Sequence, residues 1–191
     1  MNSKEYVESK RPLGNFRAIP QDRVVEIFRK DAEEWIDALT DVEKKAIRKY
    51  TYNSGDKKPN RFFERLNAML RGDIEYDERL NQYATTISGA LSKNNLKRDV
   101  VCYRNLDINL YEEFEAGDIF KEQQFISTSV VKSAALDKPY KVTLYVAKGT
   151  RCAYIESISK YPKQRELLLD KDCKYRVLSK KKNEIVLEVI S

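Results

Sequence analysis

The pattern of apolar and polar positions changes about half-way along this sequence. In the first half, from about residue 21 to 95, apolar residues recur three, four or seven positions apart, as on one face of a helix. The first such stripe consists of Val24, Phe28, Trp35 and Leu39. Because a stripe of this kind is more often part of a core than a cofactor site, it predicts a packed amphipathic helix.

Three further helices are expected in this half. The segment TDVE begins with Thr40 and has Glu43 three residues later, which is the pattern of a capping box, so a helix starts there and runs towards Tyr50. The residues NSGDKKPN, at 53–60, are typical of a loop. The segment RFFERLNAMLR predicts a short helix that ends at Gly72. The apolar face of the fourth helix is Tyr76, Leu80, Tyr83, Ile87 and Leu91.

From about residue 99 to 191 the pattern is that of strands. Short β-branched or aromatic runs are separated by charged or turn-forming residues, and these runs are DVVCYR, QFISTS, YKVTLYVA, TRCAYIES, RELLLD, KYRVLS and EIVLEVI. The basic run SKKKN, at 179–183, lies between the last two and predicts a hairpin turn. A helical half followed by a strand-rich half indicates an α+β fold with an antiparallel or mixed sheet system.

The length and composition are those of one globular domain. The chain has 191 residues, of which 41% are hydrophobic and 35% charged, and no run is long enough to span a membrane. We therefore expect residues 1–191 to form a single domain. The first residues, MNSKEYVESKRPLGNFRAIP, contain no apolar stretch of the secretory type, so a signal has been removed or another route is used.

The absence of histidine limits the chemistry. It excludes Ser-His-Asp and Cys-His triads, histidine general bases and histidine-containing zinc motifs. Cys102, Cys152 and Cys173 are odd in number and widely spaced, so we expect buried free thiols rather than disulfides or a metal site. The net charge of +6 would suit an anionic partner, but basic and acidic residues are interleaved, as on an ordinary solvated surface. A nucleic-acid binder is disfavoured because the aromatic residues occupy core-like positions.

Three short motifs in strand-like segments carry candidate chemistry. Each motif alone is commonplace. They are CYR with Arg104, FISTS with Ser127, Thr128 and Ser129, and QRE with Gln164 and Glu166. Gln164 and Glu166 are two residues apart, so in a strand both side chains would point to one face.

Taken together and in this order, the motifs resemble the R-S-E class of bacterial mono-ADP-ribosyltransferases. Within that class the sequence is most similar to the single-domain botulinum exoenzyme C-three-like group, which modifies Rho GTPases. The resemblance runs from EEWIDALTDVEKKAIRKYT to the end of the chain. It implies an ADP-ribosyltransferase fold, in which an N-terminal helical layer packs on a mixed or antiparallel two-sheet β core, and it implies NAD as co-substrate with no metal.

The resemblance also implies roles for individual residues. Cleavage of the bond between nicotinamide and ribose builds positive charge on the sugar, and Glu166 would stabilise that charge. Ser127 would orient Glu166, and Arg104 would bind the diphosphate. The remaining implied NAD contacts are Asn105, Thr128, Ser129, Lys138, Asn67 and Arg71. For Asn67 and Arg71 an ordinary amphipathic helix explains the pattern equally well.

Gln164 bears on the acceptor. Arginine-modifying relatives carry a glutamate two positions before the catalytic glutamate, whereas the Rho-modifying group carries glutamine. An amide can both donate to and accept from an asparagine side chain, while a carboxylate can only accept. The resemblance therefore implies an asparagine acceptor. It also implies that Tyr161 recognises the protein substrate, although a tyrosine covering a sheet edge is the structural alternative.

The expected function is transfer of ADP-ribose from NAD to an asparagine of a host Rho-family GTPase. The expected protein is a monomer, secreted by a bacterium and acting in the host cytosol. Alternatives that keep the fold are an arginine-specific transferase, an NAD glycohydrolase, and a binding module without turnover. The presence of Arg104, Ser127 and Glu166 argues against the last.

One departure from the family pattern generates a prediction. The loop VVKSAALDKP has Ala135 near a position where the family carries an aromatic residue, and Lys138 where it carries an arginine. Lysine keeps the charge but loses the planar fork of donors. We therefore expect weaker NAD binding than in typical family members. Calorimetric titration of both proteins under the same conditions tests this, and an equal dissociation constant contradicts it.

Overall fold

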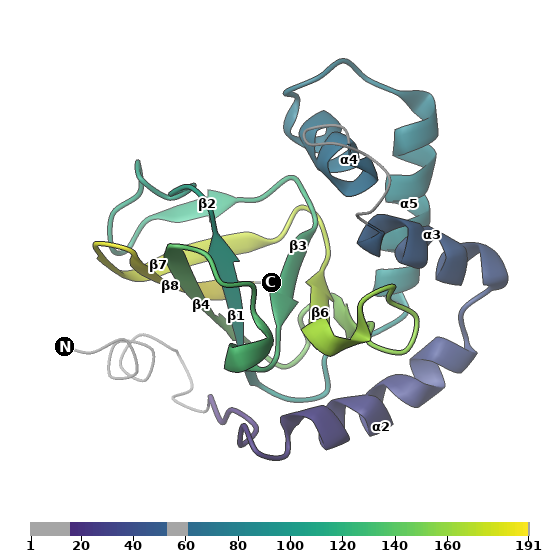
Figure 1. The fold of residues 1–191 in the computed structure, drawn as a ribbon, viewed down its shortest axis with the longest axis horizontal. Coiled ribbons are helices and arrows are strands. Elements are labelled where there is room, and N and C mark those ends of the chain that lie inside the picture. Colours follow the sequence, from purple (N-terminus) through teal and green to yellow (C-terminus); the bar gives the residue numbers. More distant parts are fainter. Residues whose placement is uncertain (1–15, 53–60, 191) are drawn as a thin grey trace.

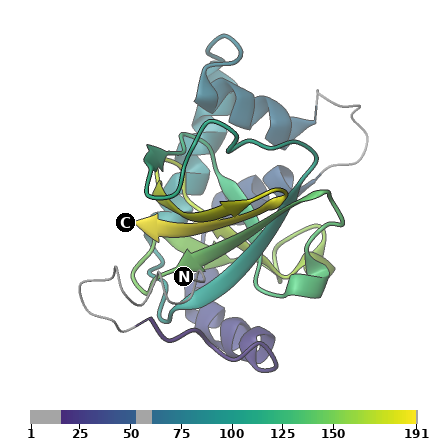
Figure 2. The same ribbon diagram turned by 90° about the vertical axis from the view of Figure 1, so that its left-hand side faces the viewer.

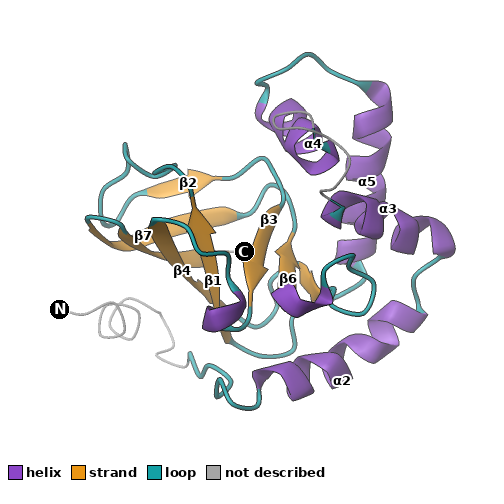
Figure 3. Ribbon diagram, in the orientation of Figure 1, coloured by secondary structure: helices purple, strands orange, loops and turns teal. Residues whose placement is uncertain are grey.

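The computed structural model describes residues 16–52 and 61–190. Among these described residues, the first half of the chain has four helices, and Figure 3 shows them as an arc around one side of the strands. They are α2 (Val24–Asp37), α3 (Asp41–Thr51), α4 (Phe62–Arg71) and α5 (Glu78–Ser92). Among the described residues no helix is both long and apolar enough to cross a bilayer.

The local signals for the first three of these helices are confirmed. All four residues of the first predicted stripe are buried. Thr40 caps α3 in a full capping box, in which its hydroxyl accepts from the Glu43 N–H and the Glu43 carboxylate accepts from the Thr40 N–H. Gly72 ends α4 in the left-handed conformation, with φ of 82°. The loop predicted at 53–60 lies outside the described residues.

The predicted face of α5 is wrong at its first position. Tyr76 precedes the helix and is 66% exposed, because Asp77 is the N-cap and its side chain accepts from the Leu80 N–H. The later positions Leu80, Ile87 and Leu91 are buried as expected. The helical spacing in the sequence therefore continued to Tyr76, one residue before the N-cap Asp77, although the helix itself begins at Glu78.

In the second half of the chain, the described residues form eight strands and two short 3-10 helices. The strands are β1 (Val100–Leu106), β2 (Ile119–Lys121), β3 (Ile126–Ser129), β4 (Tyr140–Val146), β5 (Cys152–Tyr154), β6 (Glu166–Leu169), β7 (Lys174–Lys181) and β8 (Glu184–Ile190). The 3-10 helices are η1 (Lys132–Ala134) and η2 (Pro162–Gln164). Seven strands match the predicted runs. The three-residue β2 was missed because it is too short to show alternation, and the predicted hairpin turn joins β7 to β8.

The strands follow the order β2-β7-β8-β4-β1-β3-β6-β5 (Figure 1). Among the described strands β4 and β8 are parallel and every other neighbouring pair is antiparallel. The five strands from β2 to β1 join the three strands β3, β6 and β5 through one register pair, Tyr103 with Ser129. The α+β class is thus confirmed, and all eight strands form one mixed sheet, whose two groups of strands meet at this single pair.

The smaller group of strands has both faces buried. Leu167 and Leu169 of β6 belong to the core that lies between the strands and α2, whereas Leu168 belongs to the core shared with α3, α4 and α5. This explains why RELLLD is continuously apolar rather than alternating. Figure 2, turned by 90° from Figure 1, shows the strands between α2 and the other helices.

The cysteines are unpaired. Cys102 and Cys152 are buried and Cys173 is half-buried, and all three are free thiols.

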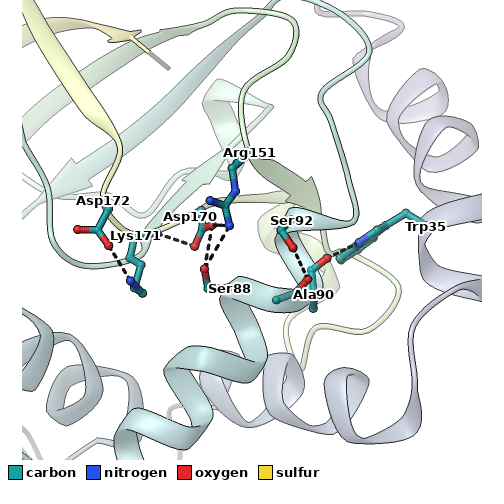
Figure 4. A network of polar contacts seen from close by, with 9 residues as sticks. Trp35, Ser88, Ala90, Ser92, Arg151, Asp170, Lys171 and Asp172 are labelled. Carbon is teal, nitrogen blue, oxygen red and sulfur yellow. Dashed lines mark hydrogen bonds and ion pairs between the residues drawn. The ribbon is translucent and has the colours of Figure 1, made fainter.

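A buried carboxylate ties α5 to the end of β6 (Figure 4). Asp170 is 1% exposed and accepts from the Ser88 hydroxyl at 3.0 Å and the Lys171 N–H at 2.8 Å. Arg151 forms an ion pair with it at 2.7 Å. Because a buried charge is stable only when it is paired and hydrogen-bonded, this cluster fixes the helical layer against the strands.

We expect Asp170→Ala to lower the free energy of unfolding by about 2 to 4 kcal/mol, because it leaves buried donors without an acceptor. Asp137→Ala is the matched control, since it removes a fully exposed partner of Lys141 and should change stability by less than about 0.5 kcal/mol. Urea denaturation followed by circular dichroism measures both. Equal midpoints for the two variants would show that the buried cluster does not stabilise the fold.

Candidate active site

A pocket opens where the two groups of strands meet beneath the helical layer. Its walls come from α3, α4, β1, β3, the loop after η1, the end of η2 and the start of β6. Eight of the eleven site residues predicted from the sequence line it, namely Asn67, Arg104, Asn105, Ser127, Thr128, Ser129, Gln164 and Glu166. The fold thus gathers all three motifs in one cavity.

The centre of the pocket is the contact between Ser127 and Glu166. Strand β3 pairs antiparallel with β6, and the register sets Ser127 opposite Leu168. Glu166 is two residues before Leu168, so its side chain lies diagonal to Ser127 on the same face. The Ser127 hydroxyl donates to the Glu166 carboxylate at 2.5 Å.

Burial changes the acidity of this carboxylate. Glu166 is 5% exposed, and this burial raises its pKa to about 7, against the opposing effects of the Ser127 hydrogen bond and the nearby Arg104 charge. The group therefore titrates near neutral pH. A carboxyl of this kind can stabilise developing positive charge or exchange a proton.

Arg104 faces the pocket from β1. Its Nη1 donates to the Ser127 carbonyl at 3.4 Å, and its Nε is buried with no hydrogen-bond partner. Asn67, on α4, similarly has a buried Oδ1 without a partner, while its Nδ2 donates to the Tyr50 hydroxyl at 3.0 Å. Because unpaired buried polar atoms are rare, these two atoms fit a polar ligand in this pocket.

Gln164 and Glu166 share the pocket, but not because both lie in a strand. Gln164 ends η2, Arg165 has a left-handed backbone with φ of 51° and ψ of 48°, and β6 begins only at Glu166. The predicted common orientation is confirmed, while the expected extended backbone is wrong. A 3-10 turn followed by one left-handed residue brings the two side chains to the same pocket instead.

Three predicted site residues do not line the pocket. Arg71 pairs with Asp73 at 2.6 Å and donates to Gln124 at 2.5 Å. Lys138 is held by Asp107, with an Nζ to Oδ1 distance of 2.6 Å. The third, Tyr161, is half-buried just before η2.

The other predicted contacts also have structural partners. The Thr128 hydroxyl donates to the Leu167 carbonyl at 2.8 Å, which ties β3 to β6. The Ser129 hydroxyl donates to the Val131 carbonyl at 2.9 Å. Asn105 donates to the Leu136 carbonyl at 2.6 Å, so it holds the loop that closes one side of the pocket. Each hydroxyl or amide therefore shapes the pocket wall.

Sequence reasoning missed Tyr50 and Phe63. Both line the pocket, and their rings meet edge to face with centroids 6.3 Å apart. Tyr50 is buried, which raises its pKa to about 12, so the phenol stays protonated next to Glu166. The only sequence signal was that Tyr50 ends an amphipathic helix, where an apolar packing role is the ordinary expectation.

No group of three or more His, Cys, Asp or Glu residues in the described part of the chain could hold a metal ion.

Comparison with known proteins identifies the family of this chain. A model of the ADP-ribosyltransferase exoenzyme family matches residues 27–190. A curated relative from Enterococcus faecalis, named NAD(+)--arginine ADP-ribosyltransferase EFV, is 32% identical over 160 residues, which are 77% of this chain. The present chain spans 31% of the length of that protein.

Solved structures share the fold. Plx2a, an ADP-ribosyltransferase toxin from Paenibacillus larvae, has a TM-score of 0.76 and 25% identity, with 91% of this chain and 98% of that chain covered. The Clostridium limosum C3 exoenzyme has a TM-score of 0.76 and 21% identity, with 93% of this chain and 98% of that chain covered. C3stau2 from Staphylococcus aureus, solved with NAD, has a TM-score of 0.73 and 21% identity, with 93% of this chain and 99% of that chain covered. The chain belongs to the ADP-ribosyltransferase exoenzyme family.

Proposed function

We propose that this protein transfers ADP-ribose from NAD to an asparagine side chain of a host Rho-family GTPase and releases nicotinamide. The observation that carries the proposal is the buried Ser127–Glu166 hydrogen bond, set beside Arg104 and Gln164 in one pocket. A carboxylate, a guanidinium suited to a phosphate group and an amide line the same pocket, and this combination supports the proposal.

NAD is the co-substrate that fits this pocket. It supplies an activated ribose whose leaving group is nicotinamide. Arg104 can bind its diphosphate through the buried Nε, which has no partner within the described chain. Asn67, Asn105 and the strand residues Thr128 and Ser129 form the surrounding wall.

Within that pocket Glu166 would act on the ribose. Its ionised carboxylate would stabilise the positive charge that develops on the ribose as the bond to nicotinamide breaks. The Ser127 hydroxyl restricts the rotation of the carboxylate. The Tyr50 phenol, which lines the same pocket, stays neutral because burial raises its pKa to about 12. The same carboxylate can then accept the proton that the acceptor nitrogen loses on forming its new bond to the ribose.

Gln164 supports the choice of asparagine. Its side chain shares the pocket with Glu166 and is neutral, so it can pair with an amide through both a donor and an acceptor. Tyr161 is half-buried at the start of the same turn, where it could contact the protein substrate. An arginine acceptor would instead favour a second carboxylate at position 164.

An arginine acceptor is the second candidate function. The name of the Enterococcus faecalis relative states arginine specificity, and that relative is 32% identical. The fold and the NAD pocket suit either acceptor, so the distinction rests on position 164 and on the surface around it.

The wider biology follows the same proposal. We propose that residues 1–191 form one catalytic domain, which acts as a monomer in the host cytosol after secretion by a bacterium. Attaching a bulky anionic group to a switch region would hinder the GTPase from exchanging partners.

The test is transfer of labelled ADP-ribose from NAD to purified Rho. We expect a labelled asparagine, located by mass spectrometry, and we expect Gln164→Ala to lose transfer while retaining NAD hydrolysis, because the pocket around Glu166 stays intact. Actin is offered in parallel as an arginine-containing acceptor. Label on an arginine would replace the asparagine proposal with the second candidate, and NAD left unconsumed by the wild type would refute the transferase proposal itself.

The acidity of Glu166 gives a pH dependence. Because the pKa is raised to about 7 and the ionised form is required, kcat/KM for NAD should rise about tenfold per pH unit below pH 7 and level off above it. Glu166→Gln should lower NAD turnover at least about 100-fold, because the amide cannot carry the negative charge that stabilises the ribose. Nicotinamide release measured from pH 5 to 9 checks both. A wild-type profile that is flat across this range contradicts the assignment of Glu166.

A further inference from the structure

Arg165, the residue between Gln164 and Glu166, has an unusual backbone. Its φ of 51° and ψ of 48° lie in the left-handed region, which residues other than glycine adopt at a cost of about 1 to 3 kcal/mol. Such a residue persists where its surroundings hold it in place. The direction in which Gln164 and Glu166 leave this turn depends on that one residue.

The backbone around Arg165 is held on both sides. The Val130 N–H, which directly follows β3, donates to the Arg165 carbonyl at 3.0 Å. The Ile155 N–H donates to the Glu166 carbonyl, also at 3.0 Å. These bonds fix the strand side of the turn, whereas the side of the turn that faces α2 is held by a side chain.

That side chain is Glu156, just after β5. Glu156 is 7% exposed and forms an ion pair with the Arg165 guanidinium. Arg29 of α2 donates to both of its carboxylate oxygens, from Nε at 2.9 Å and from Nη2 at 2.8 Å. The Tyr154 hydroxyl donates to Oε2 at 2.8 Å. One buried carboxylate therefore links helix α2 to the turn that carries the site.

The cluster lies outside the NAD pocket. Arg29, Tyr154 and Glu156 line a second cavity, which extends to Pro162 at the start of η2. None of the three lines the pocket that contains Glu166. A change in this cluster can thus alter the turn without removing a group that faces NAD.

We propose that Glu156 and Arg165 are positioning residues, and that their ion pair holds the left-handed turn that directs Gln164 and Glu166 into the pocket. The proposal rests on the proposed function, since it concerns the geometry of that reaction. A buried carboxylate with donors on all sides is rigid, and small errors in the position of a reacting group lower turnover strongly. The ion pair therefore sets turnover rather than NAD affinity.

Arg165→Gly tests whether turnover depends on the ion pair or only on the left-handed backbone conformation. Glycine adopts positive φ without strain, so the variant keeps the turn accessible while it removes the ion pair. We expect kcat for NAD hydrolysis to fall about tenfold or more, with the dissociation constant for NAD changed less than about twofold. Arg165→Lys should recover part of kcat, because lysine keeps the charge but not the fork of donors.

Glu156→Gln tests the other partner. We expect it to lower kcat to a similar extent, and the double variant Glu156→Gln with Arg165→Gly to be no slower than the slower single variant, since both changes remove the same ion pair. Arg98→Ala is the matched control. It breaks the exposed pair of Arg98 with Asp31, another arginine contact to α2, and should leave kcat unchanged.

The outcomes distinguish failure of the proposed function from failure of the positioning role. A wild type that does not consume NAD refutes the proposed function. A wild type that consumes NAD, with Arg165→Gly equally active, refutes the positioning role, as does a double variant whose losses multiply. Thermal melting of every variant identifies any that lose kcat by unfolding, and Arg165→Lys then provides the folded comparison.

Discussion

The arrangement of the whole site depends on the pairing of β3 with β6. This ladder lies between two cores, so its register is set by Leu167 and Leu169 on one face and Leu168 on the other. A slip by one residue would turn each of these side chains to the opposite core. The same register places Ser127 diagonal to Glu166, on the face that the helices cover. The packing of the leucines therefore fixes the distance between the two polar groups.

The covering helices give Glu166 its chemistry. Burial raises the pKa of Glu166 to about 7, so the folded protein favours the neutral acid, and stability falls as pH rises from the ordinary pKa near 4.5 to about 7. The ionised carboxylate is thus a destabilised group held by its neighbours. A carboxyl with a pKa raised by burial, lining a pocket, is a candidate for a catalytic position. Burial also raises the pKa of Asp170, directly after the leucines, but there Arg151 and Ser88 pair with the carboxylate.

Under the proposed function, the choice of acceptor residue depends on individual side chains rather than on the fold. The family relationship is shared with an enzyme named for arginine, whereas Gln164 suits an amide acceptor. Under the proposed function, one side chain at the end of η2 would change the acceptor while the ladder and the pocket remain the same. The turn that carries Gln164 is held from α2 through Glu156, so acceptor geometry is connected to a part of the molecule outside the pocket.

The sequence by itself determined the local elements and the identities of the candidate site residues. The caps at Thr40 and Gly72, the strand runs and the three motifs follow from spacing and propensity, which act over a few residues. Only the tertiary structure decided which side chains meet. Tyr50 lines the pocket because its ring packs on that of Phe125, just before β3. Arg165, in its left-handed turn, is paired with Glu156. Such contacts join distant segments, so no local pattern could reveal them.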